Sequence, residues 1–151
     1  MPAERLTYRL LERAEMDELL ARHNVGRIAY TFRDRVDVEP INYVYRDGWI
    51  LLRTGPGSKL NTLARHPWVA FEVDEVDGPF DWRSVVVHST VYELTPGGTE
   101  EQARLYDDAV EILRDLIPET FTESDPVPHR NVILRMKVDE VTGRASSTGP
   151  G

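Results

Sequence analysis

Alternating strands joined by very short polar turns make up the central part of the chain. In the segment VDVEPINYVY (36–45), valines occupy one face while Asp37 and Glu39 occupy the other, which is the pattern of a half-buried strand. The turn Arg46-Asp47-Gly48 follows, and Asp-Gly favours hairpins because these residues tolerate positive φ. The next segment, WILLRT (49–54), is typical of a buried strand. Because parallel strands need long crossovers, such short links predict an antiparallel sheet.

The same patterns predict about six or seven strands and three helices. Expected strands cover Arg27–Phe32, Val36–Tyr45, Trp49–Thr54, Trp68–Val76, Trp82–Leu94 and Val132–Val141. Expected helices cover Glu12–His23, Ser58–His66 and Thr99–Leu116, with Ser58 and Thr99 as N-caps. Pro40 cannot donate to a ladder, so its strand is expected at a sheet edge or bulged. Since closure removes unpaired edges, we expect an α+β fold with a small antiparallel β-barrel.

Length and charge exclude several classes of protein. The 151 residues fit one domain, expected over 1–145, with a flexible tail of small residues over 146–151. The net charge of −8 argues against nucleic-acid binding, which needs clustered Lys and Arg. Without Cys there is no disulfide framework and no thiolate nucleophile. No apolar run reaches the roughly 20 residues of a membrane span, and no secretory h-region is visible, so we expect a cytoplasmic protein.

The acidic charge is unevenly distributed along the chain. The window from Gly48 to Phe71 contains no Asp or Glu, and it holds Lys59, one of only two lysines. Within it, a strand ending at Arg53 leads through Gly-Pro-Gly into Ser58-Lys59 at a helix start. Unpaired amides at a helix N-terminus attract anions, so these residues form a candidate phosphate site. Alternatively, Gly-Pro-Gly only makes a tight turn and Ser58 only caps the helix.

Other patterns that carry chemistry are missing from the sequence. The four histidines are scattered without paired spacing, so no metal site is predicted. No GxSxG elbow is present, and no pair of catalytic carboxylates stands out. We therefore name no catalytic residue.

Several motifs in a fixed order carry a family resemblance. They are GRIAYT, VEPINYVY, DGWILLRT, GSKLNTLARHPWVAFEVD and WRSVVVHSTVYEL. In this order the chain resembles the pyridoxamine 5'-phosphate oxidase-like superfamily of FMN-binding split barrels. Within that superfamily it is similar to the small flavin-binding branch related to nitroimidazole-resistance proteins. The resemblance implies a split β-barrel of six to seven antiparallel strands with flanking helices.

The resemblance also implies a homodimer with FMN bound at the subunit interface. The isoalloxazine and ribityl chain would follow the backbone of one strand, and the phosphate would lie at the start of the short helix. The long strand would reach the flavin ring. The implied cofactor-binding residues are Val38, Glu39, Pro40, Ile41, Asn42, Arg53, Thr54, Ser58, Lys59, Trp82, Arg83 and Ser84.

The expected function is that of an FMN-binding oxidoreductase acting on an unidentified small molecule. Two alternatives remain open at this point. One is a flavin or haem carrier or sensor without turnover, and the other is a deazaflavin-dependent reductase. The substrate motif of the vitamin-B6 oxidases is not recognisable in the C-terminal third.

Overall fold

The structure is a computed structural model that describes residues 5–149, with Ser58 described by its backbone. It contains eight strands and three helices within those residues. They are β1 (Arg5–Leu10), α1 (Arg13–Arg22), β2 (Val25–Phe32), β3 (Arg35–Arg46), β4 (Trp49–Thr54), α2 (Ser58–Arg65), β5 (Trp68–Gly78), β6 (Asp81–Leu94), α3 (Glu100–Leu116), β7 (Val132–Lys137) and β8 (Glu140–Gly149). None of these helices combines the length and the apolar character that a membrane crossing needs.

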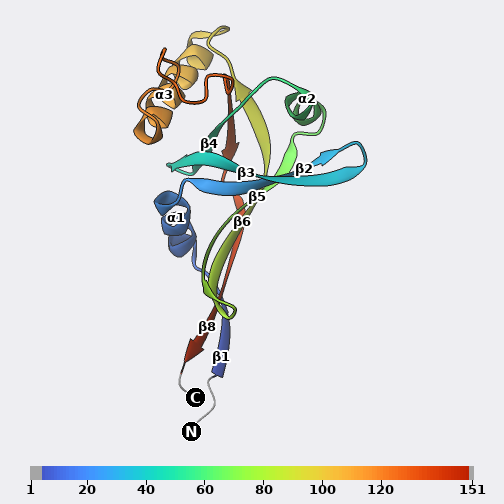
Figure 1. The fold of residues 1–151 in the computed structure, drawn as a ribbon, viewed down its shortest axis with the longest axis vertical. Coiled ribbons are helices and arrows are strands. Elements are labelled where there is room, and N and C mark those ends of the chain that lie inside the picture. Colours follow the sequence, from blue (N-terminus) through green and yellow to red (C-terminus); the bar gives the residue numbers. More distant parts are fainter. Residues whose placement is uncertain (1–4, 150–151) are drawn as a thin grey trace.

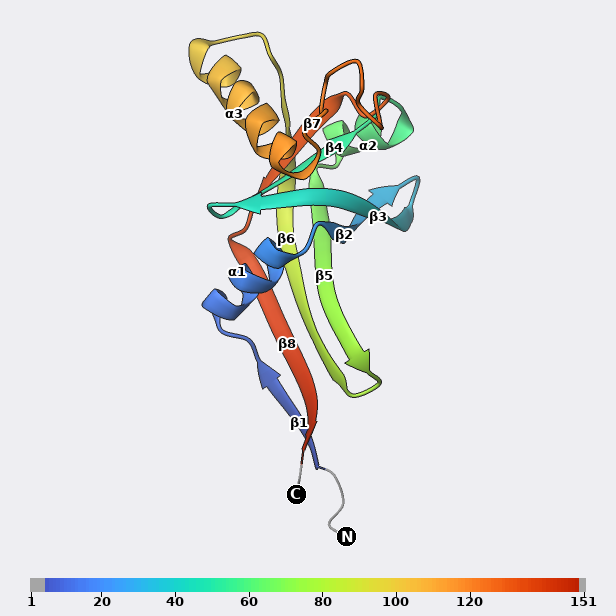
Figure 2. The ribbon, with the colours of Figure 1, turned by 60° about the vertical axis from the view of Figure 1, so that its left-hand side comes forward.

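All eight strands belong to one antiparallel sheet that closes on itself. Their order is β1-β8-β6-β5-β2-β3-β4-β7, and β6 pairs additionally with β7. The long β6 pairs with two strands on the same side: its residues 82–88 pair with β8, and its residues 91–94 pair with β7. Six strands therefore form a ring, and β8 and β1 extend from it as a ribbon (Figures 1 and 2). The predicted α+β split-barrel fold is confirmed.

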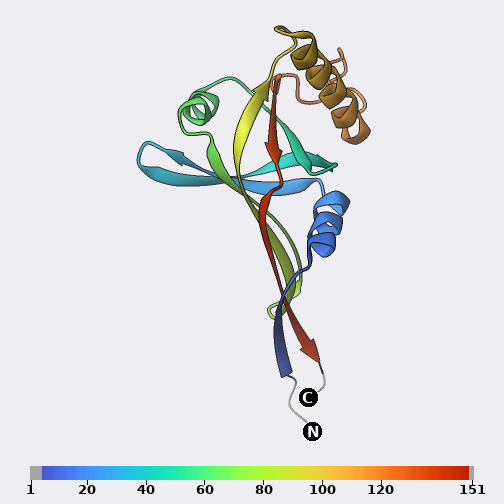
Figure 3. The ribbon, with the colours of Figure 1, turned by 180° about the vertical axis from the view of Figure 1, so that it is seen from behind.

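Two apolar cores hold the barrel and its helices together. Inside the ring, the fully buried rings of Tyr43 and Phe71 meet edge to face with centroids 5.0 Å apart. Helix α1 adds Leu19 and Leu20 to this core, and the Tyr43 hydroxyl donates to the Leu20 carbonyl over 2.7 Å. Helix α3 forms the second core against β3, β4 and β7 through its apolar stripe. Figures 1 and 3 show α1 and α3 on one side of the barrel and α2 on the other.

The structure corrects the sequence prediction at both ends of the chain. Strand β1 was not predicted; all six of its residues are exposed, and it is held by backbone pairing with β8 and by an ion pair of Arg9 with Glu15 of α1. The predicted strand Val132–Val141 is two strands, separated where the Val138 amide donates to the Gly48 carbonyl. Residues 146–149 of the predicted flexible tail lie in β8, and residues 150–151 lie outside the described part.

The helix caps follow the sequence prediction in one case and differ in the other. Thr99 caps α3 in a capping box, with its hydroxyl accepting from the Gln102 amide, as predicted. Helix α2 begins at Ser58, but its N-cap residue is Gly57, whose φ of 146° suits glycine. The prediction that Ser58 occupies the cap position was therefore wrong.

Candidate functional site

The start of α2 combines free backbone donors with a single cation. Gly55-Pro56-Gly57 connects β4 to α2, and the first amide bonded within the helix is that of Asn61, which donates to the Gly57 carbonyl. The preceding amides of the first turn are left for other acceptors, and that turn contains no acidic residue. A side chain at Gly57 would meet nothing within 4 Å, so the approach to these amides is open.

Lys59 and Glu39 meet across the gap between α2 and β3. The ammonium of Lys59 forms an ion pair with the Glu39 carboxylate, and the side chains are 23% and 37% exposed. The Tyr30 hydroxyl lies 3.5 Å from the other oxygen of that carboxylate. Burial, followed by the charges of Glu39 and Asp37, raises the pKa of Tyr30, which therefore stays a neutral donor. The structure thus brings two of the predicted site residues together, and it adds Tyr30 to them.

The rest of the β3 segment alternates between the two faces of the sheet. Ile41 is buried in the barrel, whereas Val38, Pro40 and Asn42 are exposed on the outer face. Only residues 43–46 of β3 pair with β4, so the segment 38–42 has β2 as its single neighbour. The predicted edge position of Pro40 is confirmed, and one edge of this segment is open to a ligand or to another chain.

The Arg53 side chain is buried and binds other residues of the same chain. Its guanidinium forms a buried ion pair with Asp125 over 2.6 Å and donates from Nε to the Arg130 carbonyl over 2.9 Å. It also lies 4.7 Å above the ring of Phe121. Arg53, followed by the amides of Phe121 and Val127, lowers the pKa of Asp125 to about 2. The guanidinium therefore anchors the loop after α3 to β4, and the adjacent Thr54 is buried beside it.

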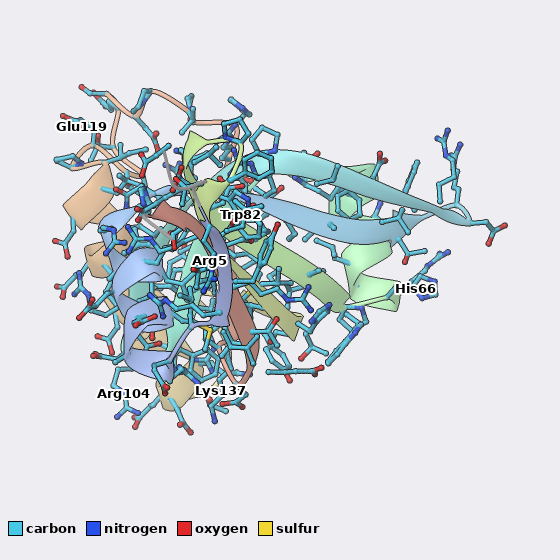
Figure 4. All side chains as sticks on the ribbon, turned by 90° about the horizontal axis from the view of Figure 1, so that it is seen from below. Arg5, His66, Trp82, Arg104, Glu119 and Lys137 are labelled. Atoms are coloured by element: carbon cyan, nitrogen blue, oxygen red, sulfur yellow. The ribbon has the colours of Figure 1, made fainter. Side chains whose placement is uncertain are left out.

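Trp82, Arg83 and Ser84 lie on β6, which is separated from β3 by the two strands β5 and β2. The Ser84 hydroxyl donates to Glu72 over 3.0 Å, and Arg83 pairs with Glu75 over 3.4 Å. Burial is the main cause that raises the pKa of Glu72. Trp82 is half-buried at the end of the molecule that carries β1 and β8, and it lines a cavity of about 470 Å³ (Figure 4). The other lining residues are Tyr8, Arg9, Leu10, Arg144 and Ala145.

The predicted site residues therefore form two groups within one chain. One group surrounds the start of α2, and the other lies on β6, with β2 and β5 between them. The Ser58 side chain lies outside the described atoms. Two groupings escaped sequence reasoning, because the partners lie far apart in the chain: Tyr30 with Glu39 and Lys59, and Arg53 with Asp125. Among residues 5–149, no group of His, Asp or Glu is arranged to hold a metal ion.

Comparisons with known proteins agree with this fold. Residues 12–145 match the sequence profile described as pyridoxamine 5'-phosphate oxidase. An uncharacterised protein of Rhizobium meliloti is 25% identical over 151 residues, which cover 93% of this chain and 97% of that protein.

Solved structures give the same result. An FAD-binding protein from Mesorhizobium loti shares 27% identity and a TM-score of 0.71, over 93% of this chain and 98% of that one. An FAD- and haem-binding protein from Mycobacterium smegmatis has a TM-score of 0.69 over 93% of this chain and 74% of that one. Its identity is 20%, so this likeness concerns the fold alone. The family profile matches most of the chain, and the chain therefore belongs to the pyridoxamine 5'-phosphate oxidase-like family.

Proposed function

We propose that the protein binds a flavin nucleotide whose phosphate lies at the start of α2. The proposed nucleotide is FMN, the smallest flavin that carries a phosphate. The observation that carries the proposal is the position of Lys59 in a helical first turn that has free amides and no acid. Such a turn attracts an anion through its amides and its dipole, and the ammonium adds a charge-assisted donor. The FAD-binding relative supports a flavin in general terms.

The residues present fit a phosphate group with one cation rather than two. Lys59 is half-buried at the first turn, and the open space at Gly57 admits a ligand close to the backbone. Arg53 does not add a second cation, because Asp125 neutralises it. Glu39 competes with the phosphate for Lys59, so a bound phosphate has to share or displace that carboxylate.

The open edge of β3 is the proposed position of the isoalloxazine and ribityl groups. Residues Val38–Asn42 have unpaired backbone groups along one side, and Glu39 within this segment contacts Lys59. A ligand whose phosphate lies at α2 would therefore continue along β3. Backbone contacts of this kind position a planar ring without needing particular side chains.

A homodimer is proposed because an apolar strip lies exposed on the outer face of the sheet. Val38, Ala29 and Ala70 are paired directly across β3, β2 and β5, and the exposed Trp68 lies on the same face. Exposed strips of this kind mark interaction surfaces. The family resemblance implies a cofactor between the two subunits, and we propose that the Trp82–Ser84 group of the second copy completes the site around α2.

The proposed activity is that of an oxidoreductase acting on a small molecule in the cytoplasm. A bound flavin supplies hydride transfer, and the residues of the chain bind and orient it. Rapid reduction by NAD(P)H and reoxidation by an added acceptor would support turnover. Stable binding without reduction would support a carrier or sensor, and preference for a deazaflavin would support the reductase alternative.

The deciding experiment is an absorption spectrum of the purified protein followed by FMN titration. Lys59→Ala should weaken FMN binding about tenfold or more, as expected for the loss of a charge-assisted bond. Lys137→Ala is the matched control, because Lys137 is the only other lysine and pairs with the exposed Asp139. A colourless protein whose melting temperature is unchanged by FMN would refute the proposal.

A further inference from the structure

The cavity of about 470 Å³ beside Trp82 lies where β1, β8 and β6 meet, at the end of the molecule away from α3 (Figure 2). Its volume falls within the usual range for small-molecule sites. Its described lining contains two aromatic and two arginine residues and no acidic one. This combination differs from the site at α2, and no residue of α2 lines the cavity.

Strand register places the two aromatic side chains on the same face of the sheet. Tyr8 pairs with Ser146, and Ser146 pairs with Trp82, so the three residues form one row across β1, β8 and β6. Ser146 is small and buried, and its hydroxyl donates to the Phe80 carbonyl over 2.7 Å. Two strand spacings separate Tyr8 from Trp82 by about 10 Å, a distance that one flat ring system can span.

The neighbouring row across the same three strands provides the charge. It consists of Leu10, Arg144 and Ser84. The Arg144 side chain is exposed and forms no ion pair and no hydrogen bond with residues 5–149 for which side chains are described. Arg9 also lines the cavity, but its guanidinium pairs with Glu15 over 2.8 Å. Arg144 is therefore the lining cation that is available to a ligand.

The acidic residues near this region lie against other groups. Asp74 shares this face of the sheet, but it does not line the cavity, and its carboxylate lies 3.4 Å from the Arg27 guanidinium. Glu75, Asp77 and Asp81 line a second cavity of about 220 Å³. The cavity beside Trp82 is therefore positively charged in a protein whose net charge is −8.

A flat ring that carries a carboxylate matches both rows of residues. A guanidinium binds a carboxylate through two parallel hydrogen bonds, and aromatic side chains offer flat apolar surfaces to a ring. We infer that the cavity binds an aromatic carboxylate, with its carboxylate on Arg144 and its ring between Tyr8 and Trp82. This inference goes beyond the proposed function and does not depend on a phosphate bound at α2.

The test measures the affinities for 2-naphthoate and for its neutral analogue 2-naphthamide by isothermal titration calorimetry. The wild-type protein should bind 2-naphthoate about fivefold more tightly, as expected for an ion pair with an exposed guanidinium. Arg144→Gln should remove this preference, and Tyr8→Ala should weaken the binding of both compounds by the same factor. Both side chains are exposed, so neither variant should disturb folding.

Arg104→Gln is the matched control, because Arg104 is exposed on α3 and does not line the cavity. It should keep the wild-type preference for 2-naphthoate. Equal wild-type affinities for the two compounds would overturn the inference, and so would a preference that persists in Arg144→Gln or affinities that are unchanged in Tyr8→Ala.

An FMN titration of the same variants distinguishes this inference from the proposed function. If FMN does not bind but 2-naphthoate binds with the expected preference, the proposed function alone fails. If FMN binds but the two naphthalene compounds bind equally, this inference alone fails. A loss of FMN affinity in Arg144→Gln as large as the loss for 2-naphthoate would assign the guanidinium to the flavin and would also overturn the inference.

Discussion

Arg53 on β4 and Asp125 in the loop after α3 form a buried ion pair across 72 residues of sequence. Their side chains are only 6% and 1% exposed, and two backbone amides also donate to the Asp125 carboxylate. The pair lies directly before the turn that leads into α2. It therefore holds the strand end that presents the proposed phosphate site.

Replacing Asp125 by Asn should destabilise the protein by about 3 kcal/mol, since removal of one partner leaves a buried guanidinium without its counter-charge. Urea unfolding followed by circular dichroism would measure the loss. Asp115→Asn is the comparison, because Asp115 pairs with Arg46 over the same 2.6 Å but is 62% exposed. It should cost less than about 1 kcal/mol. If both variants lost the same unfolding free energy, burial would not be the reason for the importance of the Arg53–Asp125 pair.

The stability contributed by Asp125 should disappear in acid. Its pKa is about 2 in the folded protein and 3.8 as an ordinary value, so folding favours the ionised form. The contribution is complete above about pH 4 and is lost as the pH falls towards 2, with a size of about 2 kcal/mol. The difference in unfolding free energy between wild type and Asp125→Asn should therefore shrink over that range. A constant difference from pH 5 to 2 would disprove the linkage.

The sequence allowed the barrel to be predicted where burial imposes a pattern. Val69, Phe71 and Val73 are buried and alternate with the less buried Ala70, Glu72 and Asp74, because one face of β5 points into the core. Strand β1 alternates as well, with Leu6, Tyr8 and Leu10 on one face, but these side chains are exposed rather than buried in the core. Its place in the sheet comes from backbone pairing with β8, and the prediction missed it. The division between β7 and β8 likewise depends on a distant partner, the Gly48 carbonyl.

The candidate site was predictable only in its local part. The Gly-rich turn and Lys59 at a helix start are neighbours in sequence, so their chemistry was visible there. The contact of Lys59 with Glu39 depends on the packing of α2 beside β3. The spacing of residues along the sequence does not predict such packing. The contact between Arg53 and a cofactor stays a prediction, and the structure assigns the guanidinium to Asp125.

Glu39→Gln should strengthen phosphate binding at α2. The substitution removes the charge that competes for Lys59 while keeping the size of the side chain. Because both partners are partly exposed, their pairing is worth at most about 1 kcal/mol, and FMN affinity should rise up to about fivefold. The gain should vanish in the Lys59→Ala background, and riboflavin, which lacks the phosphate, should show no gain. A gain for riboflavin would argue for another mechanism.

Val38→Glu should separate the proposed homodimer into monomers. Val38 is 65% exposed at the β3 end of the apolar strip, directly paired with Ala29 of β2. A carboxylate there costs little in a monomer but would be buried without a partner between two copies. Light scattering at micromolar concentration should give the dimer mass for wild type and the monomer mass for the variant. Arg104→Gln changes the net charge equally and should remain dimeric, because Arg104 lies on α3, away from this face. A wild-type monomer would refute the dimer and with it the joining of the β6 group to the site around α2.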